Sequence, residues 1–330
     1  MTRILAALLI VLTLSACDNV EWGGVRMEVV TPGSATDSAR VAPEPEPYDP
    51  GDVVLPEGPV LFMASREGTG PVEIRPVGEI RADSLRPLPL DRDSAGSSEA
   101  FVRSRMASGS AFTLFAEGTR VGTLRLSTVT FRPGRCGPIP VGTGVAELIP
   151  QAATATRFVA LPEGVGLPRT HELYEAQDHS YDQRVAGLEL AAEAISQTGA
   201  PWPGSVLETR ADMQAIPVDG DRTGAIAGSF LYQDALQIGS PLTQAAYGVF
   251  ILGTGGPTEY ALAHMEYRPV SSGKAAMRFF EQADWDGDGQ TELLLEVFGE
   301  EASWPLALDR RDGRWTRVYE EACTPSDAGS

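Results

Sequence analysis

Four acidic residues near the C-terminus are spaced in a way that suits a divalent cation. Asp284, Asp286 and Asp288 alternate along the chain, and Glu292 follows them. A hard cation such as Ca²⁺ takes about six to eight oxygen ligands. The glycines after Asp286 and Asp288 supply the backbone freedom that a tight ligand loop needs. The spacing therefore predicts a calcium site built from these carboxylates. A solvated acidic turn that holds no ion is the alternative.

Apolar segments on both sides of the acidic loop predict strands. Phe279 and Phe280 precede the loop, and Leu293–Phe298 follows it,. In an EF-hand the closing glutamate is the twelfth residue of the loop. Leu295 stands at that position here, so the loop is not an EF-hand. The predicted setting is strand, acidic loop, strand.

The pattern Asp-x-Asp-Gly-Asp-Gly-x-x-Glu between two apolar strands resembles the FG-GAP and VCBS repeats of integrin-type β-propellers. The resemblance covers Arg278 to Glu321, where Trp304–Asp309 and Trp315–Tyr319 predict two further short strands. It implies that the four carboxylates bind Ca²⁺ together with the backbone carbonyl of Gln290.

A weaker copy of the motif lies upstream. Asp219-Gly220-Asp221 aligns with Asp286-Gly287-Asp288 at an offset of 286 − 219 = 67 residues. Pro217 and Ala225 replace the first and last ligands in this copy, which predicts a degenerate repeat without metal. A chance Asp-Gly-Asp turn is the alternative. Two repeats cannot close a propeller, which needs at least about four blades, so we expect a partial propeller-like domain.

The N-terminus carries the features of an export signal. Residues 1–16 begin with a basic Arg3 and continue into an apolar run, and Leu14-Ser15-Ala16-Cys17 resembles the bacterial lipobox,. The resemblance implies cleavage before Cys17, lipidation of that residue and anchoring in the bacterial cell envelope, facing the periplasm or the exterior. A plain secretory signal with Cys17 free is the alternative. Residues 17–58 are rich in proline and acid and predict a tether.

Composition and patterning predict a mainly β protein. The chain has 35 glycines and 25 prolines with only 7% aromatic residues, which favours turn-rich β structure. We expect a small antiparallel β domain over 59–165, a helical connector over 166–204, an FG-GAP-like β domain over 205–323 and a tail over 324–330. Within the first domain, Phe112–Val129 predicts a hairpin, and 84–109 is expected to be loop-rich.

The connector contains one predicted helix. Ser180 can cap it, with Gln183 completing a capping box, and Gly199 ends it,. Its packing stripe is expected to consist of Val185, Leu188, Ala192 and Ile195.

Two cysteines remain after Cys17, namely Cys136 and Cys323. An even pair in an exported protein predicts a disulfide, with two separate thiols as the alternative. The histidines do not predict a zinc site, because Glu175 replaces the second histidine of a His-Glu-x-x-His motif that begins at His171. His264 lies in an apolar strand and is expected to be structural.

A formal charge of −19 argues against binding to nucleic acid and against direct adsorption to anionic membranes. The sequence contains no Gly-x-Ser-x-Gly elbow and no P-loop,. We therefore expect a lipid-anchored β protein with a structural calcium loop that acts as a binding or assembly module for a protein or glycan ligand. An exported hydrolase with an unrecognised active site is the alternative, so enzymatic activity stays open. A third hypothesis makes the loop a calcium-dependent adhesion contact.

Overall fold

The computed structural model describes residues 53–82, 84–90, 95–166, 174, 180–218, 221–256 and 259–323. The expected signal peptide, Cys17, most of the tether and the tail lie outside these residues. So do His171, His179, Asp219 and Gly220. The described residues are 53% strand and 15% helix, which confirms the predicted mainly β class.

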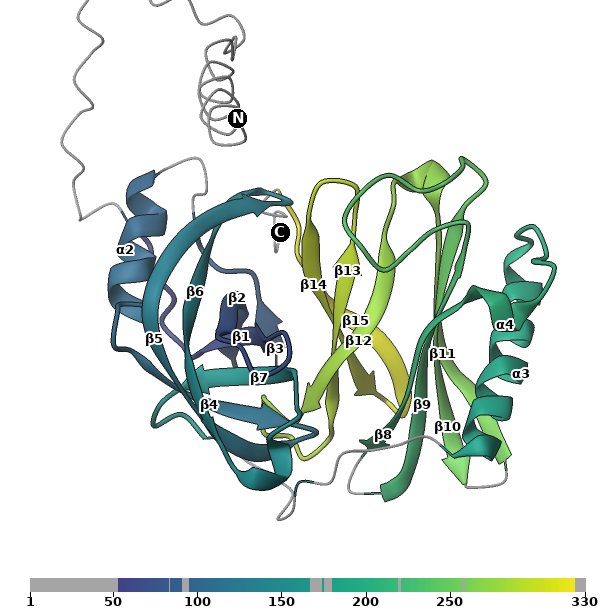
Figure 1. Ribbon diagram of the computed structural model, residues 1–330, viewed down its shortest axis with the longest axis horizontal. Coiled ribbons are helices and arrows are strands. Elements are labelled where there is room, and N and C mark those ends of the chain that lie inside the picture. Colours follow the sequence, from purple (N-terminus) through teal and green to yellow (C-terminus); the bar gives the residue numbers. More distant parts are fainter. Residues whose placement is uncertain are drawn as a thin grey trace, which may run out of the picture. The chain divides into compact units, whose positions relative to one another are not determined.

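The first seven strands form one antiparallel sheet that closes on itself. Its order is β1-β7-β4-β5-β6-β2-β3, and β1 also pairs with β2. Six strands therefore make a barrel-like ring, and β3 extends it from β2 (Figure 1). The bounds are β1 Val60–Ser65, β2 Val72–Arg81, β3 Ser84–Arg86, β4 Ala111–Ala116, β5 Thr119–Gly134, β6 Gly137–Leu148 and β7 Arg157–Pro162.

A helix that the sequence did not predict lies against the barrel-like sheet. The expectation of a loop-rich segment over 84–109 is wrong, because β3 and α2 (Ala95–Arg105) both fall there. Phe101 and Met106 are fully buried in the core inside the ring, with Phe62 and Phe112. The serine- and arginine-rich sequence of α2 hides the helix, since few of its side chains enter that core.

The remaining strands form two four-stranded antiparallel sheets, each in chain order. The first sheet contains β8 Arg210–Val218, β9 Asp221–Tyr232, β10 Tyr247–Gly256 and β11 Glu259–Pro269. The second contains β12 Ala276–Ala283, β13 Glu292–Phe298, β14 Ser303–Arg311 and β15 Arg314–Glu320. Short helical segments are η2 Pro150–Ala152, α4 Val206–Thr209 and η3 Val270–Ser272. Two such sheets do not make a propeller.

Strands β12, β13 and β14 of the second sheet are mostly buried on both faces, whereas the edge strand β15 is partly exposed. Leu293 and Leu295 pack with Phe250 of the β8–β11 sheet. Leu294 points the other way and packs with Leu61 on the outside of the barrel-like ring. Successive side chains of a strand point to opposite faces, so a run of leucines suits a strand with no solvent-facing side. The layers follow as barrel-like sheet, β12–β15, β8–β11 and α3 (Figure 1).

Helix α3 (Tyr181–Thr198) begins and ends as predicted. The Ser180 hydroxyl accepts a hydrogen bond from the Gln183 amide at 3.2 Å, and the Gln183 side chain accepts one from the Ser180 amide at 2.8 Å. Gly199 ends the helix in the left-handed conformation, with φ 69°,. No helix in the described part of the chain is both long and apolar enough to cross a bilayer.

The packing face of α3 differs from the predicted one. Its buried residues are Gly187, Leu190, Ala191, Ala194 and Ile195. Of the predicted stripe, Ile195 is buried and Leu188 is half-buried against the same core, whereas Val185 and Ala192 are not part of that core. Close approach at Gly187 sets this face, because a Cβ atom there would lie 2.4 Å from the sulfur of Met213. The predicted stripe was chosen from large apolar residues, so it missed the close contact of Gly187 with Met213, which depends on the absence of a side chain at Gly187.

A buried ion pair holds the loop between β9 and β10. Lys274 is the only lysine in the chain, and its Nζ lies 2.8 Å from Asp234 Oδ1 with both side chains almost fully buried. Breaking such a pair from one side leaves an uncompensated charge. The pair therefore ties this loop to the segment that leads into β12.

Cys136 and Cys323 form the predicted disulfide, with their Cα atoms 4.7 Å apart. Cys136 lies at the tip of the β5–β6 hairpin, and Cys323 follows the last strand. Beside the bond, Arg135 donates to the carbonyl of Glu321 at 2.7 Å. The disulfide thus joins the barrel-like sheet to the end of the β12–β15 sheet.

We expect replacement of both cysteines by serine to lower the free energy of unfolding by roughly 2–5 kcal/mol, because the cross-link restricts the unfolded chain. Urea unfolding of the double variant and of the wild type measures the difference. The reduced wild type serves as control and should match the double variant. Equal stabilities of the oxidised wild type and the variant would contradict a stabilising cross-link.

Candidate metal centre

The acidic loop connects β12 to β13, and its four carboxylates converge. Asp284, Asp286, Asp288 and Glu292 each offer one carboxylate oxygen, and these oxygens all lie within 4.8 Å of one another. The structure therefore brings together the four side chains that the spacing predicted. In the described residues this is the one group of three or more acidic, histidine or cysteine side chains arranged to hold a metal ion.

The loop backbone is shaped by its glycines and by short hydrogen bonds. Gly287 and Gly289 have φ values of 89° and 88°, a region that side chains other than glycine disfavour. Asp284 Oδ1 accepts from the Gly287 amide at 2.8 Å, and Asp286 Oδ1 accepts from the Asp288 amide at 3.1 Å. The loop thus orients its carboxylates through its own backbone.

Gln290 was expected to contribute its backbone carbonyl. Its amide donates to Asp288 Oδ1 at 2.6 Å, and its side-chain nitrogen donates to Asp288 Oδ2 at 2.7 Å. Its side-chain oxygen accepts from Arg310 Nε at 3.2 Å. These hydrogen bonds fix Gln290 beside Asp288, one of the predicted ligands. Binding of the cation by the Gln290 carbonyl stays a prediction.

Glu292 closes the site from the protein interior. Its side chain is 1% exposed, and its Oε2 accepts from the Trp285 amide at 2.8 Å. Oε1 is buried and has no hydrogen-bond partner in the described part of the chain. Trp285, between the first two aspartates, packs into the core shared with the barrel-like ring. The loop is therefore anchored from the core side and opens to solvent at Asp288.

The electrostatics of the loop favour a cation. Burial raises the pKa of Glu292 to about 10, and the charges of Asp286, Asp284 and Asp309 add to the rise, against the Trp285 amide. Burial also raises the pKa of Asp286, with the neighbouring carboxylates contributing. Carboxylates that crowd in this way resist ionisation together, and a bound divalent cation reverses that balance. An all-oxygen, acidic donor set fits a hard cation.

Asp309 is a fifth carboxylate at the site that the sequence analysis did not single out. The pairing of Leu293 with Leu308 brings Asp309 beside Glu292 on the neighbouring strand. Its Oδ2 accepts from Arg311 Nε at 2.9 Å, and Oδ1 is buried without a hydrogen-bond partner among the described residues. In the sequence, Asp309 is recognisable only as an acidic residue at the end of an apolar strand. Its place beside the acidic loop follows from the register of β13 and β14.

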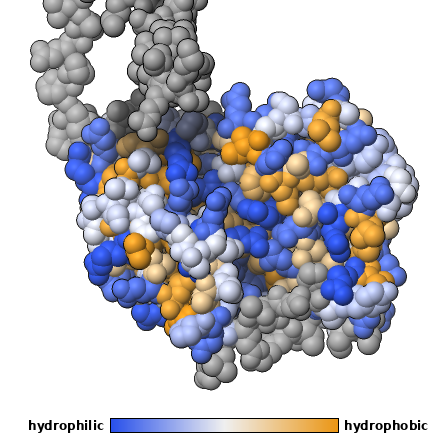
Figure 2. All heavy atoms as spheres, viewed as in Figure 1, coloured by the Kyte–Doolittle hydropathy of each residue, from blue (hydrophilic) through white to orange (hydrophobic). Residues whose placement is uncertain are grey.

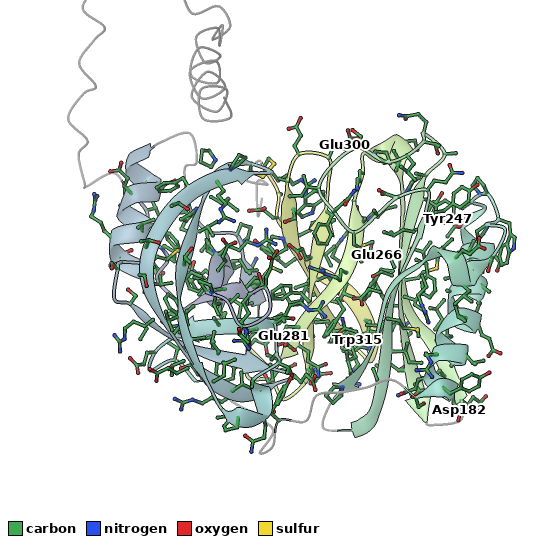
Figure 3. The ribbon with its side chains drawn as sticks, in the orientation of Figure 1. Asp182, Tyr247, Glu266, Glu281, Glu300 and Trp315 are labelled. Atoms are coloured by element: carbon green, nitrogen blue, oxygen red, sulfur yellow. A yellow bond between two sulfur atoms is a disulfide. The ribbon has the colours of Figure 1, made fainter. Side chains whose placement is uncertain are left out.

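Glu281 is a second buried acid that the sequence analysis missed (Figure 3). It sits at an irregularity in the pairing of β12 with β13. Its Oε1 accepts from the amides of Glu117 at 2.8 Å and Gln282 at 3.0 Å. Glu117 lies in the β4–β5 turn, so this contact joins β12 to the barrel-like sheet. Burial raises the pKa of Glu281 to about 8, against the two amide hydrogen bonds.

His264 on β11 takes part in the contacts that join the edge strands β11 and β15 of the two stacked sheets. Its Nδ1 is 3.0 Å from the carbonyl oxygen of Trp315 on β15, and its Nε2 is 3.5 Å from Glu266 Oε1. Arg268 and Arg317 also contact Glu266. These contacts agree with the structural role expected for His264.

Comparison of the chain with protein-family models, with curated proteins and with solved structures finds no match. The function is therefore inferred from the site and the sequence motifs themselves.

We expect Glu281 to make the folded protein less stable as the pH rises. Its pKa is about 8 in the folded state against an ordinary 4.5, so the folded state binds the proton more tightly. The stability that this proton supplies is complete below about pH 4.5 and is lost as the pH rises through about 8. Thermal unfolding of the Glu281→Gln variant between about pH 5 and pH 9 should show a flatter pH dependence than the wild type.

The matched control is Glu189→Gln on the exposed face of α3, which should leave the pH dependence of the wild type unchanged. An unchanged slope in Glu281→Gln would show that Glu281 does not carry this effect.

Proposed function

We propose that this protein is a lipid-anchored, extracytoplasmic β protein of the bacterial cell envelope. In it a divalent cation, calcium, stabilises the acidic loop, and the folded part acts as a binding or assembly module. The convergence of four carboxylates within 4.8 Å at the β12–β13 connection carries the proposal.

Calcium suits the donor set better than a smaller ion. Four carboxylates and the Gln290 carbonyl offer at least five oxygens, and solvent reaches the site at the exposed Asp288. Calcium accepts a large and irregular set of oxygen ligands, whereas magnesium requires near-octahedral geometry and keeps more of its water. The buried Glu292 Oε1, which has no hydrogen-bond partner among the described residues, gains a ligand bond when an ion is present.

A structural role for the ion is favoured over an adhesion contact. Asp284 and Glu292 are buried, and Trp285 between the ligands packs into the core beside the barrel-like ring. The ion would thus neutralise charge at the end of a strand that is buried on both faces. An adhesion contact needs a ligand position open to a partner, and only Asp288 among the four carboxylates is exposed.

The sheet arrangement supports a pair of FG-GAP-like repeats. In each four-stranded sheet the strands follow chain order, and the acidic loop joins the first two strands of the second sheet. The degenerate copy corresponds to the connection between β8 and β9, the first two strands of the other sheet. Asp219 and Gly220 in that connection lie outside the described residues. The family assignment rests on this agreement of motif and strand order.

Envelope anchoring is supported by the lipobox at Leu14–Cys17 and by the proline- and acid-rich segment that follows it. The disulfide between Cys136 and Cys323 suits an oxidising compartment. Two acyl chains on the processed N-terminus would give stable membrane attachment.

We expect calcium to raise the melting temperature and a chelator to lower it. Binding to the folded state alone adds about 4 kcal/mol when the ion is present at a thousand times its dissociation constant. Calorimetric melting of the wild type, with calcium, magnesium or manganese added in turn, measures the effect and ranks the ions. The Asp286→Asn variant should lose most of the calcium-dependent shift, whereas Glu189→Gln on α3 should keep it. No shift with any ion would remove the structural cation from the proposal.

We expect the Cys17→Ser variant to leave the membrane fraction, because lipidation requires that thiol. Fractionation of cells that produce the full chain, followed by detection of the protein, measures the change. A Ser15→Ala variant, which retains the cysteine, should stay with the membranes. Membrane recovery of the Cys17→Ser variant at the level of the wild type would contradict anchoring through Cys17.

A further inference from the structure

A cavity of about 1000 Å³ lies between the barrel-like sheet and the two stacked sheets. Four arginines from four elements line it, namely Arg66 after β1, Arg132 on β5, Arg157 on β7 and Arg278 on β12. Figure 2 shows hydrophilic residues gathered along the middle of the face that it draws. Four guanidinium groups around one cavity are unexpected on a chain with a formal charge of −19.

Two of these arginines are held by carbonyl groups rather than by acids. Arg66 donates to the carbonyls of Ala155 at 2.9 Å and Ala153 at 2.6 Å. Arg157 donates from Nη1 to the carbonyl of Phe279 at 2.7 Å. Asp212 lies 4.0 Å from that same nitrogen, beyond hydrogen-bonding distance. The carbonyls fix the position of these guanidinium groups without neutralising them.

Arg278 shares its acidic partner with Arg75, which lines an adjoining smaller recess. Glu296 pairs through Oε1 with Arg75 at 2.8 Å and through Oε2 with Arg278 at 2.6 Å. Arg278 Nε is buried and has no hydrogen-bond partner within the described ranges. The fourth arginine, Arg132, is neutralised by Glu73 through two hydrogen bonds.

The charges of the lining are nearly balanced, but they are not all paired. Arg66, Arg132, Arg157 and Arg278 line the cavity together with the acids Glu67, Glu73 and Asp212. Glu73 is taken up by Arg132, whereas Arg66 and Arg157 donate to carbonyl groups. Burial lowers the pKa of Arg157, against the charges of Asp212, Glu281 and Glu296, and the nearby charge of Arg278 lowers it further. An oxyanion bound between Arg157 and Arg278 would favour the charged form of both guanidinium groups.

We propose that this cavity binds a small molecule through an anionic carboxylate or phosphate group, held by Arg157 and Arg278. The planar guanidinium fork matches both oxyanions with paired hydrogen bonds. Arg66 borders the same recess and adds charge. The volume exceeds that of a lone oxyanion and falls in the range of sites that enclose a drug-sized ligand, so the anion is one group of a larger polar molecule such as an acidic sugar.

This site names a ligand class for the binding role proposed above and rests on that role, but it does not depend on the cation loop. The test is run on the full chain with calcium present throughout. A negative result then leaves the outcome of the calcium melting experiment unaffected, and the failure of either proposal is distinguishable from that of the other.

The test is isothermal titration with three matched probes at low salt. Glucose 6-phosphate and glucuronate carry the two anionic groups, and glucose is their neutral counterpart. We expect at least one anionic probe to bind with one-to-one stoichiometry and glucose to give no signal. Binding of the phosphate alone or of the carboxylate alone supports the proposal and identifies the source of the anion.

Matched variants locate the site. Arg278→Gln and Arg66→Gln should each weaken binding, with a loss of roughly tenfold or more for Arg278→Gln, because charge-assisted hydrogen bonds are lost. Arg103→Gln makes the same charge change on the exposed face of α2, where Arg103 pairs only with Glu99, and should leave binding unchanged. Arg157→Gln is added if its melting temperature shows that it folds.

Three results would overturn the proposal. They are the absence of binding by both anionic probes, equal binding of glucose, and binding that Arg278→Gln and Arg66→Gln leave as strong as in the wild type.

Discussion

Burial of strands β12 to β14 on both faces is the constraint that organises this protein. Leu294 packs toward the barrel-like ring, while Leu293 and Leu295 pack toward the β8–β11 sheet. Burial of apolar surface is the main driving force of folding, and it is roughly proportional to the area removed from water. A strand with no exposed face joins two cores into one body. The ring and the outer sheet each depend on it for one of their packed surfaces.

The acidic loop lies at the end of this buried sheet, where charge and packing compete. Glu292 begins β13 and is almost fully buried, so its carboxylate must be either protonated or neutralised by a cation. Trp285 fixes the same loop to the core beside the ring. The charge state of the acidic loop therefore affects how the barrel-like sheet packs against the β12–β15 sheet. A cation at this point would act on the contact between layers and not only on a surface turn.

The sequence predicts local features here and misses features that depend on register or on absent side chains. The acidic loop and the capping box at Ser180 are determined by residues close together in the sequence, and the disulfide is determined by the chemistry of its two cysteines. These features could therefore be predicted. Asp309 joins the acidic site only through the pairing of β13 with β14. Glu281 on β12 contacts the β4–β5 turn of the adjacent layer. The face of α3 follows from close packing at Gly187. Closure of the ring requires β1 to pair with both β2 and β7, which no local pattern encodes.

The ion pair between Lys274 and Asp234 has a consequence for chemical labelling. Since Lys274 is the only lysine of the chain and its side chain is 1% exposed, the folded protein offers no accessible ε-amine to acylating reagents or amine cross-linkers. Reaction at this residue requires the loop between β9 and β10 to move away from β12. The rate of acylation at Lys274 would thus report how often that loop opens, with no background from other lysines.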